Sequence, residues 1–90
     1  MAIKKIARPV NEAKNKFIQW LKYNKAESID EYEGKESSEW DYYRVISAFI
    51  GNDLYIVYFM VWNGKIEIDY HDEENNYKKL TVIDFLQLID

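Results

Sequence analysis

Three residues that can ligate a metal ion alternate along one short segment: Glu67, Asp69 and His71, in the pattern E-x-D-x-H. Alternate side chains of a strand point to the same face, so these three would lie together. Carboxylate and imidazole ligands suit manganese or another divalent ion. Short acidic spacings are nevertheless common on solvated strand faces, and no supporting second layer of groups is visible in the sequence. We therefore predict no metal site.

Other catalytic chemistry is excluded by the residue inventory. The chain has one histidine and no cysteine, which removes thiolate catalysis, disulfides and cysteine-ligated zinc. The four serines lack the glycine context of a nucleophile elbow. Three scattered glycines form no phosphate-binding loop. We predict that the protein is not an enzyme and uses no cofactor.

The segment 40–70 holds most of the large apolar side chains and predicts three antiparallel strands. Asn63-Gly64 lies between two apolar runs and favours a type I′ turn, which needs positive φ at both central positions. Gly51-Asn52 suits a type II′ turn, which needs positive φ at the first central position only. The two turns divide the segment into a meander of three strands.

The turn at Asn63-Gly64 sets which side chains share a face of the sheet. One face is almost purely apolar and is the predicted core: Val57, Phe59, Val61, Ile66, Ile68 and Tyr70. The other face mixes apolar and polar groups: Ile56, Tyr58, Met60 and Trp62 beside Lys65, Glu67, Asp69 and His71. The middle strand is therefore apolar on both faces, which is unusual for a sheet with one side in water.

The register of the first strand has two alternatives. A two-residue turn at Gly51-Asn52 pairs Ile50 with Asp53 and sends an apolar set to the core, but Arg44 with it. A three-residue turn would flip the strand and send Tyr43, Val45 and Phe49 inward instead. The glycine position favours the two-residue turn, which we predict.

Helical patterns flank the strands. Residues 10–25 carry an apolar stripe at helical spacing, with Asn11 as a plausible N-cap. Thr81 to Asp84 fits a capping box that begins a last helix, with Phe85 continuing its apolar side. Between these helices and the strands lie an acidic loop, 26–39, and a polar connection, 71–79.

Taken together, the 90 residues predict one domain, 1–90, of the α+β class: helix, three-stranded antiparallel meander, helix. The net charge of −4 is unevenly distributed, with +6 over residues 1–26 and −10 over residues 27–90. Such a split indicates either charged partners or internal docking of one part on the other. With neither a membrane span nor a signal segment visible, we expect a soluble cytoplasmic protein.

The apolar strip of Ile56, Tyr58, Met60 and Trp62 is too large to leave in water. Either the two helices cover opposite faces of the sheet, or both share one face and the strip meets another protein. Tyrosine, tryptophan and methionine are enriched in the cores of protein interfaces. The sequence leaves the two alternatives open.

We predict a non-catalytic acidic protein-binding module, an inhibitor or regulator of a nucleic-acid-handling or toxic protein. In size, acidity and lack of catalytic groups the chain resembles small phage or mobile-element inhibitors of host defence, and toxin-immunity proteins. The predicted partner-binding residues are acidic and apolar: Glu31, Glu33, Glu36, Glu39, Tyr58, Met60 and Trp62. The carboxylates would imitate nucleic-acid phosphates for a basic host protein and speed its association.

Two other function classes stay open. One is a structural or regulatory homodimer packed through its apolar sheet face. The other is a small nucleic-acid binder that uses the basic first helix, with lysines for phosphate and Trp20 and Tyr23 for stacking. Trp20 belongs to the apolar stripe, and the fifteen acids of residues 27–90 would repel phosphate, so we expect no direct nucleic-acid binding.

Overall fold

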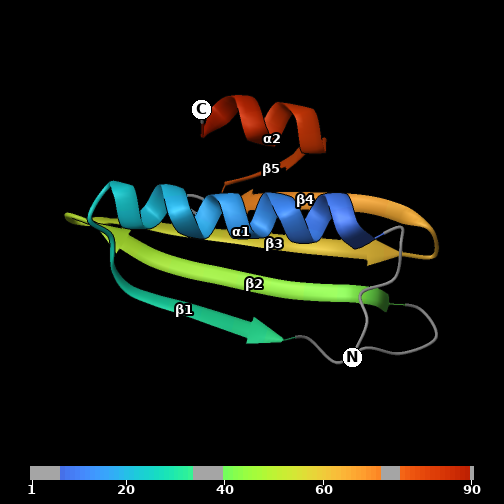
Figure 1. Cartoon of the computed structure of the whole chain (residues 1–90), viewed down its shortest axis with the longest axis horizontal. Helices are drawn as coiled ribbons and strands as arrows, with labels where there is room; N and C mark the ends of the chain where they lie inside the picture. The colour runs from blue at the N-terminus through green and yellow to red at the C-terminus, as the bar shows by residue number, and fades with distance from the viewer. Residues whose placement is uncertain (1–6, 34–39, 72–75, 90) are drawn as a thin grey trace.

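The chain folds into one antiparallel sheet with two helices against it (Figure 1). The structure, a computed structural model, describes residues 7–33, 40–71 and 76–89. Its elements follow in the order α1 (Arg8–Tyr23), β1 (Glu27–Glu33), β2 (Trp40–Ile50), β3 (Asp53–Trp62), β4 (Lys65–His71), β5 (Tyr77–Leu80) and α2 (Val82–Leu88). Each strand pairs with the next one along the chain, which makes a five-stranded meander. The α+β class is confirmed.

The prediction of three strands was wrong at both edges of the sheet. Residues 27–33, expected within the acidic loop 26–39, form β1 on the edge of β2, while residues 34–39 lie outside the described part. Residues 77–80 form β5 on the edge of β4, where a polar connection was expected. Both edge strands are mostly exposed. An edge strand needs no apolar face of its own, because its neighbour supplies the backbone hydrogen bonds and water solvates the rest.

The two predicted turns have the expected geometry. Asn63 and Gly64 have φ of 48° and 77°, as a type I′ turn requires, and Trp62 pairs with Lys65. Gly51 has a φ of 62° and Asn52 has a negative φ, in agreement with a type II′ turn. Ile50 pairs with Asp53. The two-residue turn and its register are therefore confirmed.

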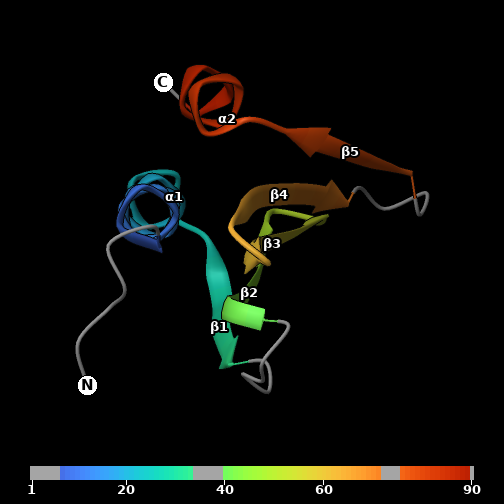
Figure 2. The same ribbon diagram turned by 90° about the vertical axis from the view of Figure 1, so that its right-hand side faces the viewer.

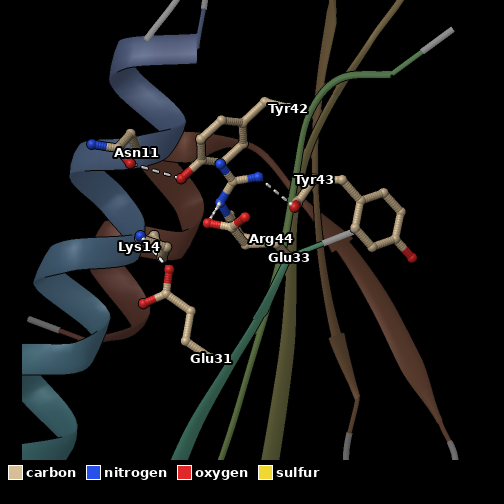
Figure 3. Close-up of polar contacts among 7 residues, drawn as sticks. All are labelled: Asn11, Lys14, Glu31, Glu33, Tyr42, Tyr43 and Arg44. Atoms are coloured by element: carbon tan, nitrogen blue, oxygen red, sulfur yellow. Dashed lines mark hydrogen bonds and ion pairs between the residues drawn. The ribbon is translucent and has the colours of Figure 1, made fainter. Parts of the chain in front are cut away.

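Arg44, which argued against this register, does lie on the core side of β2, between Glu33 of β1 and Phe59 of β3. Its guanidinium stacks over the Tyr42 ring at 4.7 Å, donates a hydrogen bond of 2.8 Å to the Tyr43 carbonyl and lies 3.7 Å from the Glu33 carboxylate (Figure 3). The Arg44 side chain is only 12% exposed, and its charge is tolerated because the Glu33 carboxylate, the Tyr43 carbonyl and the Tyr42 ring surround it.

Both helices pack on the same face of the sheet, as Figure 2 shows. The Phe59 ring of β3 contacts Phe17 of α1 at 6.0 Å and Phe85 of α2 at 5.2 Å between centroids. Phe17 and Phe85 also meet edge to face at 5.5 Å. This trio is the centre of a core whose buried members are Ala7, Val10, Ala13, Phe17, Leu21, Tyr42, Ile46, Ala48, Val57, Phe59, Val61, Ile68 and Phe85.

The N-terminus of α2 is capped as the sequence predicts, whereas the N-terminus of α1 is not. Thr81 Oγ1 accepts a hydrogen bond of 3.0 Å from the Asp84 amide, so the predicted cap of α2 is present. Helix α1 starts at Arg8, with Ala7 at the N-cap and no side-chain cap, so Asn11 was wrongly predicted as the cap. Asn11 Oδ1 instead accepts a hydrogen bond of 2.7 Å from the Tyr42 hydroxyl. That contact joins the first helix to β2.

Candidate interaction surface on the uncovered sheet face

One face of the sheet is covered by no described element, because α1 and α2 both pack on the other. We call it the open face. Strand alternation and pairing register place eight apolar or aromatic side chains of β2 and β3 on it: Tyr43, Val45, Phe49, Leu54, Ile56, Tyr58, Met60 and Trp62. The predicted residues Tyr58, Met60 and Trp62 thus lie together, and of the two alternatives left open, the arrangement with both helices on one face holds.

A row of rings crosses four strands of the open face. Tyr43 of β2 meets Tyr58 of β3 edge to face at 6.4 Å between centroids. Tyr58 packs on the imidazole of His71 in β4 at 4.9 Å, and His71 stacks on Tyr77 of β5 at 5.6 Å. Contacting rings hold one another in place, so this row is a preformed surface.

The apolar side chains of the open face differ in how much surface they offer. Met60 is only 4% exposed and offers little surface to a partner, whereas Trp62 and Phe49 are 45% and 43% exposed. Phe49 pairs with Leu54, which precedes Trp62 by eight residues on β3. At about 3.3 Å per residue the two exposed rings are roughly 26 Å apart along the strands. A surface of that length fits a protein partner better than a small ligand.

Two carboxyl groups of β4 border the aromatic row. Glu67 and Asp69 alternate on the open face, opposite Met60 and Tyr58 respectively. Burial raises the pKa of Asp69 above its ordinary value, and the adjacent Glu67 raises it further, against an opposing effect of Lys79. Oδ1 of Asp69 is buried without a hydrogen-bond partner among the described residues. The ammonium of Lys79 lies 3.7 Å from Glu67.

Burial also raises the pKa of the Tyr43 hydroxyl, with smaller contributions from Tyr58 and Asp69. The Tyr43 phenol therefore stays protonated well above neutral pH and remains a hydrogen-bond donor. Together with Asp69, it gives the apolar row a polar and partly acidic border.

The E-x-D-x-H pattern forms no metal centre in the described part of the chain, which contains no group of three His, Cys, Asp or Glu side chains placed to hold an ion. The imidazole of His71 is engaged by the rings of Tyr58 and Tyr77.

Of the four glutamates predicted to bind a partner, the two that the structure describes, Glu31 and Glu33, do not lie beside this aromatic strip. Glu31 and Glu33 lie on the helix-covered side of β1, where Glu31 accepts a hydrogen bond of 2.7 Å from the Lys14 ammonium (Figure 3). Glu33 faces Arg44 at 3.7 Å. Glu36 and Glu39 lie outside the described residues. The described acids nearest the apolar strip are instead Glu67 and Asp69.

Sequence reasoning did not name Tyr43, Phe49 and Tyr77 as partner-binding residues. Tyr43 and Phe49 follow from the two-residue turn and its alternation, once that register is accepted. Tyr77 required the recognition of β5, whose four residues carry no apolar alternation. Two residues of the basic first helix that could have contacted nucleic acid are engaged within the fold. Lys14 is buried against the sheet, and Trp20 packs on Phe17 and Tyr55.

Comparisons with protein families, with curated proteins and with solved structures found no match to this chain. Neither helix of the described residues is long and apolar enough to cross a membrane.

Proposed function

We propose that this chain is a non-catalytic protein-binding module that docks on another protein through its open face. The observation that supports the proposal is the placement of both helices on one side of the sheet, which leaves the strip around Tyr58, Met60 and Trp62 without a covering element in the described part. Exposed apolar patches of this kind mark interaction sites in proteins of this size.

The chemistry of the open face favours a partner with basic and apolar groups side by side. Tyrosine and tryptophan side chains anchor interfaces because they bury a large area with few rotatable bonds. Glu67 and Asp69 place two carboxyl groups at the border of this surface, beside Lys79, in a chain whose net charge is −4. Complementary charge accelerates association and selects the partner.

The biological role in this proposal is inhibition or regulation of a nucleic-acid-handling or toxic protein. Proteins that bind nucleic acid present basic grooves or patches to it. A small acidic domain without a catalytic centre acts on such a target by occupying its surface. Anti-defence proteins of mobile elements and immunity proteins work by this type of blockade.

The test is a pull-down from the source cell followed by titration of the captured protein. Trp62→Ser and Phe49→Ser each remove a ring that is nearly half exposed, so the fold should persist while affinity falls at least tenfold. Met60→Asp is unsuitable, because Met60 is buried and a charge there would destabilise the sheet. Tyr23→Ser is the matched control, since Tyr23 is 86% exposed on α1. Equal binding by all variants would refute the proposal.

The electrostatic part of the proposal needs a separate test. Reversal of Glu31 or Glu33 would disrupt the ion pairs with Lys14 and Arg44, so these positions report on folding rather than on docking. Glu36→Lys and Glu39→Lys leave the described ion pairs intact. If they contribute to the encounter, the double variant should slow association and weaken its salt dependence, with little effect on dissociation. Unchanged association rates would show that these two residues do not contribute to partner binding.

A homodimer is the second candidate, because the open face can pack on its own copy. The molecular mass measured by solution scattering distinguishes the homodimer from a monomer that binds another protein. A dimer that Trp62→Ser converts to a folded monomer would assign the open face to self-association, and a monomer at all concentrations would leave it for another protein.

A further inference from the structure

The helix side of the molecule contains a cavity that the proposed function does not use. It measures about 330 Å³ and lies between α1, α2 and the last three strands, on the side opposite the open face. Its walls come from five elements and are mostly apolar, and the residues that matter for its chemistry are Phe17, Trp20, Tyr55, Tyr70, Lys78 and Phe85.

One wall of the cavity is a continuous aromatic surface. Phe17 stacks on Trp20 at 5.9 Å, Trp20 meets Tyr55 edge to face at 5.9 Å, and Tyr55 contacts Tyr70 at 6.2 Å. The rings belong to α1, β3 and β4, and each is partly or fully buried. A wall that is fixed before a ligand arrives costs little ordering on binding.

The cation at this cavity comes from β5. Lys78 pairs in register with Tyr70, so alternation directs it to the helix side, whereas the next residue, Lys79, lies on the open face near Glu67. Lys78 forms no ion pair with a carboxylate of the described residues. A lysine beside an aromatic wall can neutralise an anion while its stem covers apolar surface.

Asp84 also lines the cavity, but it has a structural role in α2. Its amide donates to Thr81 Oγ1, and its carboxylate lies in the first turn, where a negative charge stabilises a helix. Lys78 lies in an edge strand and has no comparable role. Among the residues that line the cavity, the one cation available to a ligand is the ammonium of Lys78.

We infer that this cavity binds a small amphipathic anion, with an aromatic or aliphatic body against the Trp20–Tyr55–Tyr70 wall and one carboxylate or sulfonate at Lys78. The volume is at the lower end of small-molecule sites, which admits a two-ring aromatic acid or a medium-chain fatty acid. The inference is independent of the proposed function, because the open face contributes no residue to the cavity.

The experiment is a titration of the full chain with 2-naphthoate, followed by calorimetry and by amide shifts in an NMR spectrum. We expect one site, with shifts concentrated on α2, β5 and the end of α1. Lys78→Ala should weaken binding at least fivefold, and Lys79→Ala, its neighbour on the opposite face, should leave it unchanged. The neutral analogue 2-naphthalenemethanol and the cationic 2-naphthylmethylamine should bind at least fivefold more weakly than the acid.

A second variant tests the cavity itself. Leu88 lines the cavity and is 59% exposed, so Leu88→Trp can fill the space without entering the core. We expect it to abolish 2-naphthoate binding while the thermal midpoint stays within a few degrees. Equal affinity of the Lys78→Ala and Lys79→Ala variants, preference for the amine, or shifts confined to the open face would each overturn the inference.

Discussion

The ammonium of Lys14 lies 2.7 Å from the carboxylate of Glu31, and this pair docks the basic start of the chain on its acidic continuation (Figure 3). Lys14 is only 8% exposed although it is charged. The uneven charge of the sequence allowed external partners or internal docking. For this pair the structure shows internal docking, which ties the edge strand β1 to α1.

Glu31→Gln tests that contact. It keeps the size of the side chain and removes the charge that neutralises a buried ammonium. We expect a loss of about 1–2 kcal/mol in the free energy of unfolding, at the low end for a hydrogen bond to a charged group because Glu31 is partly hydrated. Urea denaturation measures it. Glu27→Gln, in an exposed position of the same strand, is the control and should change little.

Phe59→Ala tests the central contact of the core. Phe59 is fully buried between Phe17 and Phe85, so truncation leaves a cavity that neither helix can fill. The expected loss is ~3–5 kcal/mol, enough to unfold much of a domain this small. Phe49→Ala removes the same ring from the open face and should cost far less. A loss below about 1 kcal/mol for Phe59→Ala would contradict the observed core.

Thr81→Ala tests the cap of α2. The Asp84 amide would lose its hydrogen-bond acceptor, at a cost of about 1 kcal/mol. Thr81→Ser retains a hydroxyl and should retain most of the stability. Thermal melting of the two variants compares them directly, and equal midpoints for alanine and serine would mean that this hydrogen bond contributes nothing measurable.

Asp69→Asn tests the raised pKa on the open face. A carboxyl group whose pKa is higher in the folded state binds its proton more tightly there, so the folded protein loses stability as pH rises from the ordinary aspartate range through the raised pKa. Asparagine removes this loss. The variant should therefore melt higher than the natural protein at pH 7, and the difference should shrink below about pH 4, where aspartate is protonated in both states. A difference independent of pH would contradict the assignment.

Much of the sheet could be predicted from short stretches of sequence. Asn63-Gly64 and Gly51-Asn52 set the two central turns, because few residues tolerate positive φ. These two turns set the strand register, which places Phe59 on the core face of the sheet. The cap at Thr81 is equally local. Each of these features depends on neighbours along the chain, which a sequence displays directly.

Other features were decided only by the tertiary structure. The polar segment that contains Glu31 pairs as a strand because β2 offers it an open edge and Lys14 offers it a charge, and neither is visible within the segment. The apolar stripe of α1 shows that it packs on the sheet but not on which face. That choice follows from Phe17 and Phe85 meeting at Phe59, because one shared core buries three rings together. The same packing leaves Trp62 and its neighbours on the open face, so the candidate interaction surface is a consequence of where the helices pack.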